Sequence, residues 1–362
     1  MKYLEIKKED LCFNIKKLKE YCAPAKIIAV LKGNAYGLDM VKMGHILLEK
    51  GVELFAVSEL SEALVLREAG FENEIILLTP TNDVDEAKVI VDNKITATVA
   101  SLNNAKLLNG IGLPVNAHIK IDTGFGRYGF CTDELTEDLK SFENISYTGV
   151  FSHFSNSFGD DVTYSKKQFA EFEKATEKLL DIGINPPLKH ICNSCGAIRF
   201  DFARLDAVRI GSAFLGRLPI ANTLGLKRLV QLKCNVTEIR HLPKGSVVGY
   251  ANTYTAKRDT VAAIIPVGYK DGYGVQKSND VFRFKDILRY IFADFKMWKK
   301  KIWVDINGKK YPIIGRISMY NIVVDVTDGN VQIGDMATLE CNPILIKSEI
   351  ERLYINGGKG NE

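Results

Sequence analysis

The sequence contains no uninterrupted apolar run of ~18 residues, the length that suggests a membrane-spanning helix. Low-complexity tracts are also absent, and the 48 basic and 44 acidic residues leave a net charge of only +4. One basic cluster, Lys299-Lys300-Lys301, is expected to be a solvated corner. The sequence therefore gives no indication of a membrane or nucleic-acid partner.

Cysteine is scarce and odd in number, with seven residues scattered along the 362-residue chain. The first residues, MKYLEIKKEDL, are too charged for a signal peptide, so we expect a cytoplasmic protein with free thiols. Cys192 and Cys195 form a C-x-x-C, which is compatible with a redox pair or with half of a metal site. Because a structural zinc site needs a second such pair, and none is present, no metal is predicted.

Short apolar runs alternate with amphipathic stretches, such as 59–70 and 164–183, up to about residue 215. The eight runs are residues 26–32, 54–58, 74–79, 95–100, 115–122, 147–154, 188–194 and 207–214. This alternation predicts parallel strands with right-handed crossovers, and eight such units close into a (β/α)8 barrel of the TIM type. An open doubly wound sheet is the alternative, but its G-x-G-x-x-G motif is missing after the first run.

The pattern changes after about residue 225, where alternating apolar residues and turn signals indicate strands. Asn307-Gly308, between two such runs, predicts a hairpin. An aromatic and basic segment at 276–300 interrupts this region and is expected to be helical. We therefore predict an α/β protein with a barrel over residues 6–225 and a mostly β domain over 226–362, to which residues 1–5 add a strand.

Polar residues stand where several of the predicted strands end. They are Lys32, Lys120, Asp122, His153, Asn193, Ser194 and Arg209. The carboxyl ends of barrel strands meet at one mouth, so we expect these side chains to converge there. Lys32 is a candidate nucleophile, because a partly desolvated lysine has a lowered pKa and its neutral amine can form a Schiff base. The alternative is a surface lysine at a strand end. Tyr36 offers a phenol near the same point.

The stretch AVLKGNAYGLD, residues 29–39, closely resembles the pyridoxal-phosphate attachment motif of alanine racemases, which are fold-type III enzymes of the vitamin B6 class. Further motifs follow that family's pattern in its order. They are HIKIDTGFGRYGF (118–130), GVFSHF (149–154), HICNSCGAIR (190–199), DAVRIG (206–211), VVGYANTYTA (247–256), IIPVGYKDGYG (264–274) and IIGRISM (313–319). Together the motifs span nearly the whole chain.

The resemblance implies that pyridoxal 5′-phosphate is the cofactor and that Lys32 holds it as a Schiff base. The other cofactor-binding residues that it implies in the barrel are Tyr36, His153, Asn193, Ser194, Arg209, Gly211 and Ser212. Hydroxyl and N–H groups of Tyr36, Ser194, Gly211 and Ser212 would hold the phosphate, although Asn193-Ser194 could instead cap the following helix.

Arg209 would face the pyridine nitrogen. An arginine keeps its proton, so the ring nitrogen would stay unprotonated, which suits a racemase. An ion pair with Asp206 is the alternative role for Arg209.

Inverting a stereocentre requires proton removal on one face and delivery on the other, so two bases are needed. By resemblance, Lys32 works on the D face and Tyr250 on the L face. Tyr250 would bond His153, which bonds Arg209, and would reach the site from a partner subunit. A homodimer with shared active sites is therefore implied. Without the other motifs, Tyr250 could equally be a strand tyrosine packed on the sheet.

Substrate-binding residues are carried over in the same way. Arg127 would hold the cofactor's phenolic oxygen and the substrate carboxylate, and Lys120 would brace it if that lysine carries a carbamate. Met319 would offer a backbone N–H to the carboxylate, and Tyr269 would line the substrate channel. His190 has either a direct role or a purely structural one, and three further histidines are expected to be structural, namely His45, His118 and His241.

The sequence departs from the family at four points. Tyr320 follows Met319 where an aspartate is usual, Val275 stands where an arginine is common, and segment 276–300 is additional. These three changes lie on the β-domain side of the substrate entrance, so substrate size or charge could differ from alanine. Tyr354 corresponds to the family's last phosphate ligand, but its surroundings match poorly.

The leading hypothesis is a racemase that interconverts L- and D-alanine and supplies D-alanine for a bacterial cell wall. The same chemistry on serine, lysine or ornithine is the nearest alternative. A fold-type III decarboxylase is disfavoured by Arg209 and Tyr250. A non-catalytic carrier of pyridoxal phosphate is disfavoured by the β domain, which such small single-barrel proteins lack.

Overall fold

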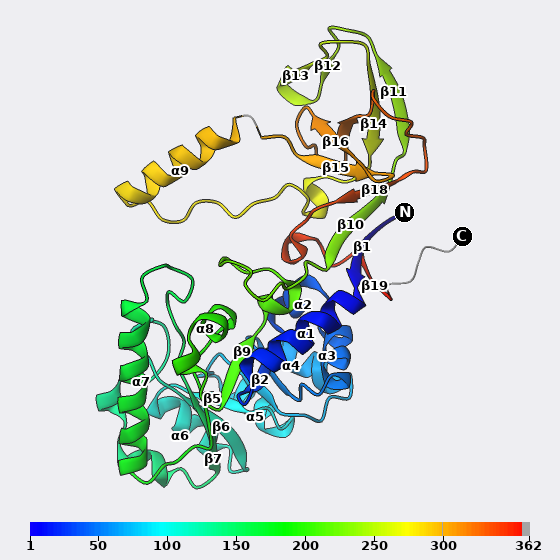
Figure 1. Ribbon diagram of the computed structural model, residues 1–362. Helices are drawn as coiled ribbons and strands as arrows, with labels where there is room; N and C mark the ends of the chain where they lie inside the picture. Colours follow the sequence, from blue (N-terminus) through cyan, green and yellow to red (C-terminus); the bar gives the residue numbers. More distant parts are fainter. Residues whose placement is uncertain (299, 357–362) are drawn as a thin grey trace. The chain divides into compact units, whose positions relative to one another are not determined.

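The computed structural model of the protein describes residues 1–298 and 300–356. Lys299 of the basic cluster and residues 357–362 of the predicted β domain lie outside the described residues. The chain divides into two compact units, which Figure 1 shows in ribbon form. One unit is Lys8–Leu229, and the other joins Met1–Lys7 to the residues from Val230 onward.

Eight parallel strands form a barrel in the Lys8–Leu229 unit. They are β2 (Lys26–Val30), β3 (Leu54–Val57), β4 (Ile75–Leu77), β5 (Ala97–Val99), β6 (Val115–Lys120), β7 (Ile145–Phe151), β8 (Leu188–His190) and β9 (Ala207–Ile210). Their ladders run in the orders β4-β3-β2-β9 and β5-β6-β7-β8. A parallel bridge between Ile76 and Thr96 joins the two ladders on one side. On the other side the N–H of Arg209 donates to the carbonyl of Cys192 at 3.0 Å, so the ring closes and the predicted barrel is confirmed.

Helices follow most of these strands. They are α1 (Lys8–Cys22), α3 (Met40–Glu49), α4 (Leu60–Glu68), α5 (Val84–Asp92), α6 (Leu102–Gly110), α7 (Thr163–Asp181) and the short α8 (Ser194–Arg199). Side-chain caps fix where they begin: Asp83 accepts from two N–H groups at the start of α5, and Ser101 accepts from one at the start of α6. Between β6 and β7 two 3₁₀ turns, Thr132–Glu134 and Glu137–Ser141, replace a helix.

The barrel strands are apolar along their length because helices and barrel interior bury both of their faces. One core cluster joins Ile28, Val30, Ala56, Ile76 and Ala207 from four strands. Burying each large apolar side chain contributes about 1.5–3 kcal/mol, so a polar residue within such a run is costly. Polar side chains are therefore concentrated at the strand ends, where the site lies.

The other unit is built on a nine-stranded sheet in the order β11-β14-β17-β16-β15-β18-β10-β1-β19. The strands are β1 (Lys2–Lys7), β10 (Val230–Asn235), β11 (Glu238–Leu242), β14 (Thr260–Ile265), β15 (Trp303–Ile306), β16 (Lys309–Ile314), β17 (Ile322–Asp325), β18 (Met336–Leu339) and β19 (Glu351–Ile355). A separate ribbon pairs β12 (Val247–Val248) with β13 (Tyr254–Thr255). The N-terminal strand pairs with β10 and β19, and the expected β-rich region is confirmed.

Two local predictions in this unit also hold. Asn307 and Gly308 both have positive φ, 54° and 78°, and they connect the antiparallel strands β15 and β16 as a hairpin. The segment 276–300 contains the helix α9, Phe284–Met297. Among the described residues, the helices are all too short or too polar to cross a membrane.

Candidate active site

Lys32 stands directly after the first barrel strand, at the start of a left-handed turn, α2 (Lys32–Gly37). Residues 33–36 have φ between 52° and 62°, a conformation that costs a non-glycine residue about 1–2 kcal/mol. Contacts outside the turn compensate this cost: Glu62 Oε1 accepts from the N–H of Gly33 at 2.5 Å. The strained turn brings Lys32 and Tyr36 to the same cavity.

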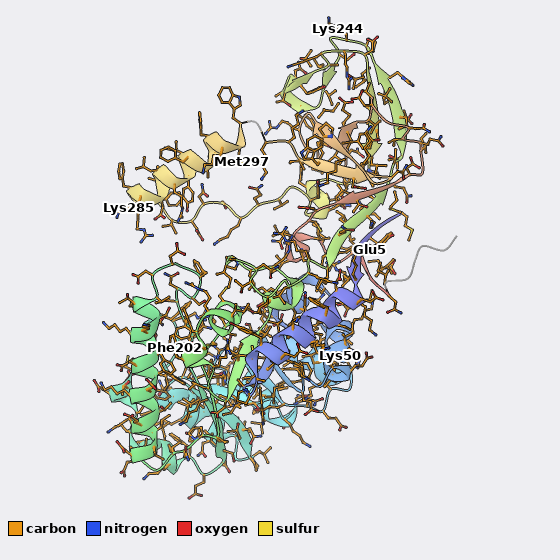
Figure 2. All side chains as sticks on the ribbon, in the orientation of Figure 1. Glu5, Lys50, Phe202, Lys244, Lys285 and Met297 are labelled. Carbon is orange, nitrogen blue, oxygen red and sulfur yellow. The ribbon has the colours of Figure 1, made fainter. Side chains whose placement is uncertain are left out.

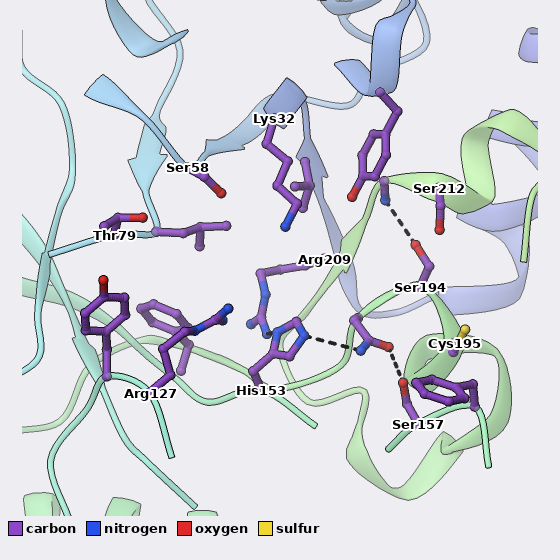
Figure 3. Close-up of a pocket in the computed structure, with 18 of the residues that line it drawn as sticks. Lys32, Ser58, Thr79, Arg127, His153, Ser157, Ser194, Cys195, Arg209 and Ser212 are labelled. Atoms are coloured by element: carbon purple, nitrogen blue, oxygen red, sulfur yellow. Dashed lines mark hydrogen bonds between the residues drawn. The ribbon is translucent and has the colours of Figure 1, made fainter. Parts of the chain in front are cut away.

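The cavity at the carboxyl ends of the strands has a volume of about 530 Å³. Ten of the predicted site residues of the barrel line it, as Figure 3 shows for most of them. They are Lys32, Tyr36, Lys120, Arg127, His153, Asn193, Ser194, Arg209, Gly211 and Ser212. The structure thus brings together residues that the chain separates by 180 positions.

The lysine and arginine side chains that line this cavity give it a positive charge. Lys32, Lys120, Arg127 and Arg209 are among the lining residues, and none of the described residues that line the cavity is an aspartate or a glutamate. Lys120 and Arg209 are buried, whereas Lys32 and Arg127 are exposed, and a cation is costly to bury without a paired carboxylate. The arrangement therefore favours a ligand that carries several negative charges.

Both lysines are shifted toward the neutral amine. Burial lowers the pKa of Lys32, and the neighbouring Arg127 lowers it further. Burial, with Arg209 and Arg127, lowers the pKa of Lys120 to about 7. The Lys120 ammonium nitrogen lies 4.3 Å from the ring centre of Phe151. A neutral amine is the form that attacks a carbonyl or carbon dioxide, so both lysines are suited to covalent modification.

Arg209 is almost fully buried at the end of β9 and donates in several directions. Its guanidinium donates to His190 Nδ1 at 2.6 Å, to the carbonyl of Ser152 at 2.6 Å and to His153 Nδ1 at 3.1 Å. The alternative ion pair with Asp206 is wrong, because the Asp206 carboxylate accepts instead from the N–H of Lys189 at 2.8 Å. Burial lowers the pKa of Arg209 to about 10, which leaves it charged at neutral pH.

A chain of buried histidines runs from Arg209 to the opposite side of the barrel. His190 Nε2 lies 3.0 Å from His118 Nδ1, and His118 Nε2 lies 3.4 Å from Glu74 Oε1. Burial, followed by Arg209, lowers the pKa of His190 well below its ordinary value, so this ring is neutral. His118 and Glu74 were not among the predicted site residues. They connect to the site through His190, and His118 also contacts Phe151, which lines the cavity.

A cluster of small polar groups lies beside Tyr36. Ser194 Oγ accepts from the N–H of Gly211 at 3.1 Å. The side chain of Asn193 accepts from the N–H of Gly196 at 3.0 Å, so Asn193 is the cap of α8 and leaves the Ser194 hydroxyl in the cavity wall. A Cβ atom on Gly211 would stand only 2.4 Å from the phenol oxygen of Tyr36. Glycine is therefore required here for the backbone and the phenol to approach.

The loop after β6 shows where one prediction fails. Asp122 was expected to converge on the mouth, but it is not among the residues that line the cavity. Its carboxylate accepts instead from the N–H groups of Gly124, Phe125 and Gly126, at 2.8–3.1 Å. A carboxylate next to consecutive N–H groups is satisfied by its own turn. Asp122 thus shapes the loop that carries Arg127 into the cavity.

The remaining predicted residues belong to the β unit. Tyr250 opens a 3₁₀ turn between β12 and β13 and is 68% exposed, so the alternative of a strand tyrosine packed on the sheet is wrong. The N–H of Tyr269 donates to the carbonyl of Ser318, and the N–H of Lys270 donates to that of Met319, so Tyr269 and Met319 lie on adjoining loops. Tyr354 lies on β19 opposite Ile6 of β1.

Several cavity residues were missed by the sequence analysis. Ser58 and Thr79 follow β3 and β4, and Tyr128 and Phe158 lie in the loops after β6 and β7. Ser58 and Thr79 are polar residues just after a strand, so the rule that located Lys32 would also have identified them. The two aromatic residues had no such signal, because exposed aromatic residues in loops are not specific to a site.

The C-x-x-C pair does not have the properties of a redox centre. Cys192 and Cys195 are both buried, and Cys192 Sγ donates to the carbonyl of Ala203 at 3.2 Å. Burial raises the pKa of the Cys192 thiol to about 12, whereas reactive cysteines have a lowered pKa. Within residues 1–298 and 300–356, no group of three or more histidine, cysteine, aspartate or glutamate side chains could hold a metal ion.

A closed barrel with a cavity-lining lysine just after its first strand, followed by a β-rich unit, defines the class of two-domain barrel racemases. The family models agree: "Alanine racemase, N-terminal domain" matches residues 6–219, and "Alanine racemase, C-terminal domain" matches residues 229–351. The chain therefore belongs to the alanine racemase family. The decarboxylase and carrier alternatives receive no support from these matches.

Individual relatives show how far the similarity extends. The alanine racemase of Methanococcus maripaludis is 32% identical over 340 residues, which cover 90% of this chain and 85% of that protein. The alanine racemase of Clostridium perfringens is 33% identical and covers 93% of this chain and 85% of its own length. Among solved structures, alanine racemase of Clostridium difficile 630 superposes with a TM-score of 0.86 at 27% identity, covering 98% of this chain and 96% of its own. The alanine racemase of Bacillus anthracis with bound L-Ala-P has a TM-score of 0.83 at 28% identity, covering 99% of this chain and 96% of its own.

Proposed function

We propose that the protein interconverts L-alanine and D-alanine with pyridoxal 5′-phosphate as cofactor, through Lys32 and Tyr250 as two bases, in a homodimer with shared active sites. Its product would supply D-alanine for peptidoglycan. The observation that carries the proposal is the cavity itself, in which a lysine with a lowered pKa stands among three further cations and no lining carboxylate. The names of the relatives support alanine as the substrate.

The residues present fit the proposed cofactor. A phosphate dianion would be held by the hydroxyls of Ser194, Ser212 and Tyr36 and by the N–H of Gly211, which meet at one end of the cavity. Lys32 would hold the cofactor covalently, and its lowered pKa supplies the neutral amine that this requires. When bound, the cofactor supplies the electron sink that makes the substrate's α-proton removable.

Arg209 would tune that electron sink. Because an arginine donates and does not release its proton, it would leave the cofactor's ring nitrogen unprotonated and the sink weak. A weak sink favours return of the proton over the loss of other groups, which supports racemisation rather than decarboxylation. The buried hydrogen bonds of Arg209 to His190, Ser152 and His153 fix its guanidinium in place.

The proton-handling role of Tyr250 would depend on His153. Burial, followed by Arg209, lowers the pKa of His153 well below its ordinary value, so the ring is neutral. Arg209 donates to Nδ1, and the proton of the neutral ring is therefore on Nε2. Asn193 Nδ2, which is itself a donor, lies 3.5 Å from Nε2. The Nε2 proton is thus available for an acceptor such as the phenol oxygen of Tyr250.

Arg127 would hold the substrate carboxylate, with a backbone N–H from Met319, while Tyr269 lines the channel. Lys120 would carry a carbamate that braces Arg127. Its pKa of about 7 supports this role, because a large fraction of the amine is free to react with carbon dioxide at neutral pH. The carbamate would also replace one of four cations by an anion, which reduces repulsion within the cavity. Tyr354 would complete the phosphate site.

A panel of L-amino acids, each incubated with the purified protein and separated by chiral chromatography, tests the substrate. We expect alanine to be inverted fastest. Serine, lysine and ornithine belong in the panel because Val275 and Tyr320 replace the family's usual arginine and aspartate. Inversion of any of these as fast as alanine would contradict the assignment.

Lys32→Ala is the matched control for that assay. We expect it to lose all racemisation and the absorbance of lysine-bound cofactor near ~420 nm. Carbon dioxide release from any amino acid by the wild-type protein would indicate the decarboxylase instead.

A further inference from the structure

The helix α9 presents a broad apolar face that the described residues do not cover. An α-helix turns about 100° per residue, so seven apolar side chains of α9 and its C-terminal cap fall within one arc of about 140°. They are Phe284, Ile287, Leu288, Ile291, Phe292, Phe295 and Trp298. All seven are exposed, and Phe292, Phe295 and Trp298 remain 67%, 69% and 78% accessible. Figure 2 shows side chains projecting from this helix between Lys285 and Met297.

The opposite side of the helix carries Ala293 and Met297 but is otherwise more polar and internally paired. Asp286 is buried and forms ion pairs with Arg283 at 2.7 Å and with Arg289 at 3.0 Å. Lys285 and Lys296 lie at about 100° and 120° on the same wheel, beside the edge of the apolar face. The helix therefore has an aromatic and aliphatic face, a basic border along one edge with Asp294 beside the other edge, and an ion-paired cluster on its back.

The segment that contains α9 also carries the positive charge of the protein. Residues 276–302 include eight lysines and arginines and three aspartates, a net charge of +5. Since the whole chain carries +4, the remaining residues together carry −1. The positive charge is thus concentrated around one exposed apolar surface.

We propose that α9 binds the surface of an anionic lipid bilayer, with its apolar face inserted among the headgroups and its basic border against lipid phosphates. An aromatic and aliphatic face bordered by lysines is the pattern of helices that lie in the plane of a membrane interface. At about 21 Å for fourteen residues, the helix is too short to cross a bilayer but long enough to lie along one. The absence of a spanning segment argues only against crossing, so it does not conflict with this surface role.

Charge favours a bilayer over a second copy of the chain as the occupant of this face. Two segments that each carry +5 repel each other, whereas an anionic surface attracts both. The inference does not depend on the proposed racemase activity, because α9 contributes no residue to the cavity.

Vesicle binding by the full-length holoenzyme tests the inference. Phosphatidylcholine vesicles with phosphatidylglycerol should co-sediment with the protein, and vesicles of phosphatidylcholine alone should do so at least about tenfold less well. High salt should weaken the binding. In a Trp303→Phe background Trp298 is the single tryptophan, and its emission should shift to shorter wavelength and be quenched by brominated lipid.

Matched variants separate the apolar face from general effects. The pair Ile291→Asp and Phe295→Asp should reduce vesicle binding about tenfold or more, and so should Lys285→Glu with Lys296→Glu. Ala293→Asp places a charge on the opposite side of the same helix and should leave binding unchanged. Racemisation of free amino acid in buffer should be the same in all of these variants. Loss of racemisation in a variant would therefore indicate damage to the enzyme and would say nothing about membrane binding by α9.

Three outcomes would overturn the proposal. One is failure of the wild-type protein to bind anionic vesicles. Another is equal loss of binding in Ala293→Asp and in the face variant. The third is a change in oligomeric state of the face variant, measured by light scattering, without a change in vesicle binding; that result would make the face a contact between protein chains.

Discussion

At the scale of single residues, Arg209 sets the direction of hydrogen bonding through the barrel interior. An arginine only donates, so His190 must accept at Nδ1 and carry its proton on Nε2. His118 then accepts at Nδ1, and its Nε2 lies 3.4 Å from Glu74 Oε1. The chain therefore leads from a buried cation through two imidazoles to a carboxylate.

Replacing Glu74 by glutamine should destabilise the protein in a pH-dependent way. The hydrogen bond from His118, opposed by burial, lowers the pKa of Glu74 below its ordinary value of 4.5. A lowered carboxyl pKa stabilises the folded state above the unfolded-state value, and this contribution is lost as the pH falls through the folded-state pKa. In urea unfolding, the wild type should therefore exceed Glu74→Gln most clearly near pH 7, and the two should converge below about pH 4.5.

Glu72→Gln serves as the control, because Glu72 is an exposed carboxylate two residues earlier. It should match the wild type at every pH. A difference between Glu74→Gln and the wild type that stays constant from pH 7 to pH 4 would contradict the charged role of Glu74.

At the scale of elements, the sequence predicts the barrel well because the apolar pattern of each strand can be recognised from neighbouring residues alone. Strands that are buried on both faces must be apolar throughout, so each of the eight appears as a short run. The rule that their carboxyl ends converge then locates Lys32, Lys120 and Arg209 in one cavity. The same rule fails at Asp122, because whether a polar side chain enters the mouth or turns to its own backbone depends on the loop conformation.

The contacts that form the chain of buried histidines could not be predicted from the sequence, for a different reason. His118, His190 and Arg209 come from three strands, and Glu74 immediately precedes a fourth. Their contacts depend on the register of strands in the closed barrel, which no local pattern specifies. His118 was accordingly expected to be structural only.

Gly211 precedes the 3₁₀ turn Ser212–Leu215 and lies close to Tyr36 of α2. A substitution at Gly211 therefore tests how these two elements pack against each other. A Cβ at Gly211 would meet the Tyr36 ring at 2.4–2.7 Å, so Gly211→Ala must displace Tyr36. Overpacking of this kind costs about 1–3 kcal/mol, and we expect cofactor affinity, measured by fluorescence titration, to fall roughly tenfold. Gly110→Ala is the control, since its Cβ would meet nothing within 4 Å and affinity should not change. Unchanged affinity in Gly211→Ala would mean that Tyr36 does not hold the phosphate.

At the scale of the whole molecule, the predicted machinery is divided between two units. The barrel holds Lys32, Arg209 and the other cavity residues, whereas Tyr250, Tyr269 and Met319 belong to the unit that starts again at Val230. The proposed site needs residues from both units. It can be assembled within one chain or between two chains. These two possibilities predict different activity when two inactive variants are mixed.

Mixed dimers of two inactive variants distinguish a site within one chain from a site shared between two chains. Lys32→Ala and Tyr250→Phe should each be nearly inactive alone, because each removes one of the two proposed bases. If the site is shared, a mixed dimer has one site in which both bases are intact and one in which both are missing. Random exchange of equal amounts makes half of the dimers mixed, so the mixture should recover about a quarter of the wild-type activity. Each variant incubated with itself is the control. If subunit exchange, followed with two affinity tags, is complete and activity does not return, the two bases come from the same chain and the shared site is wrong.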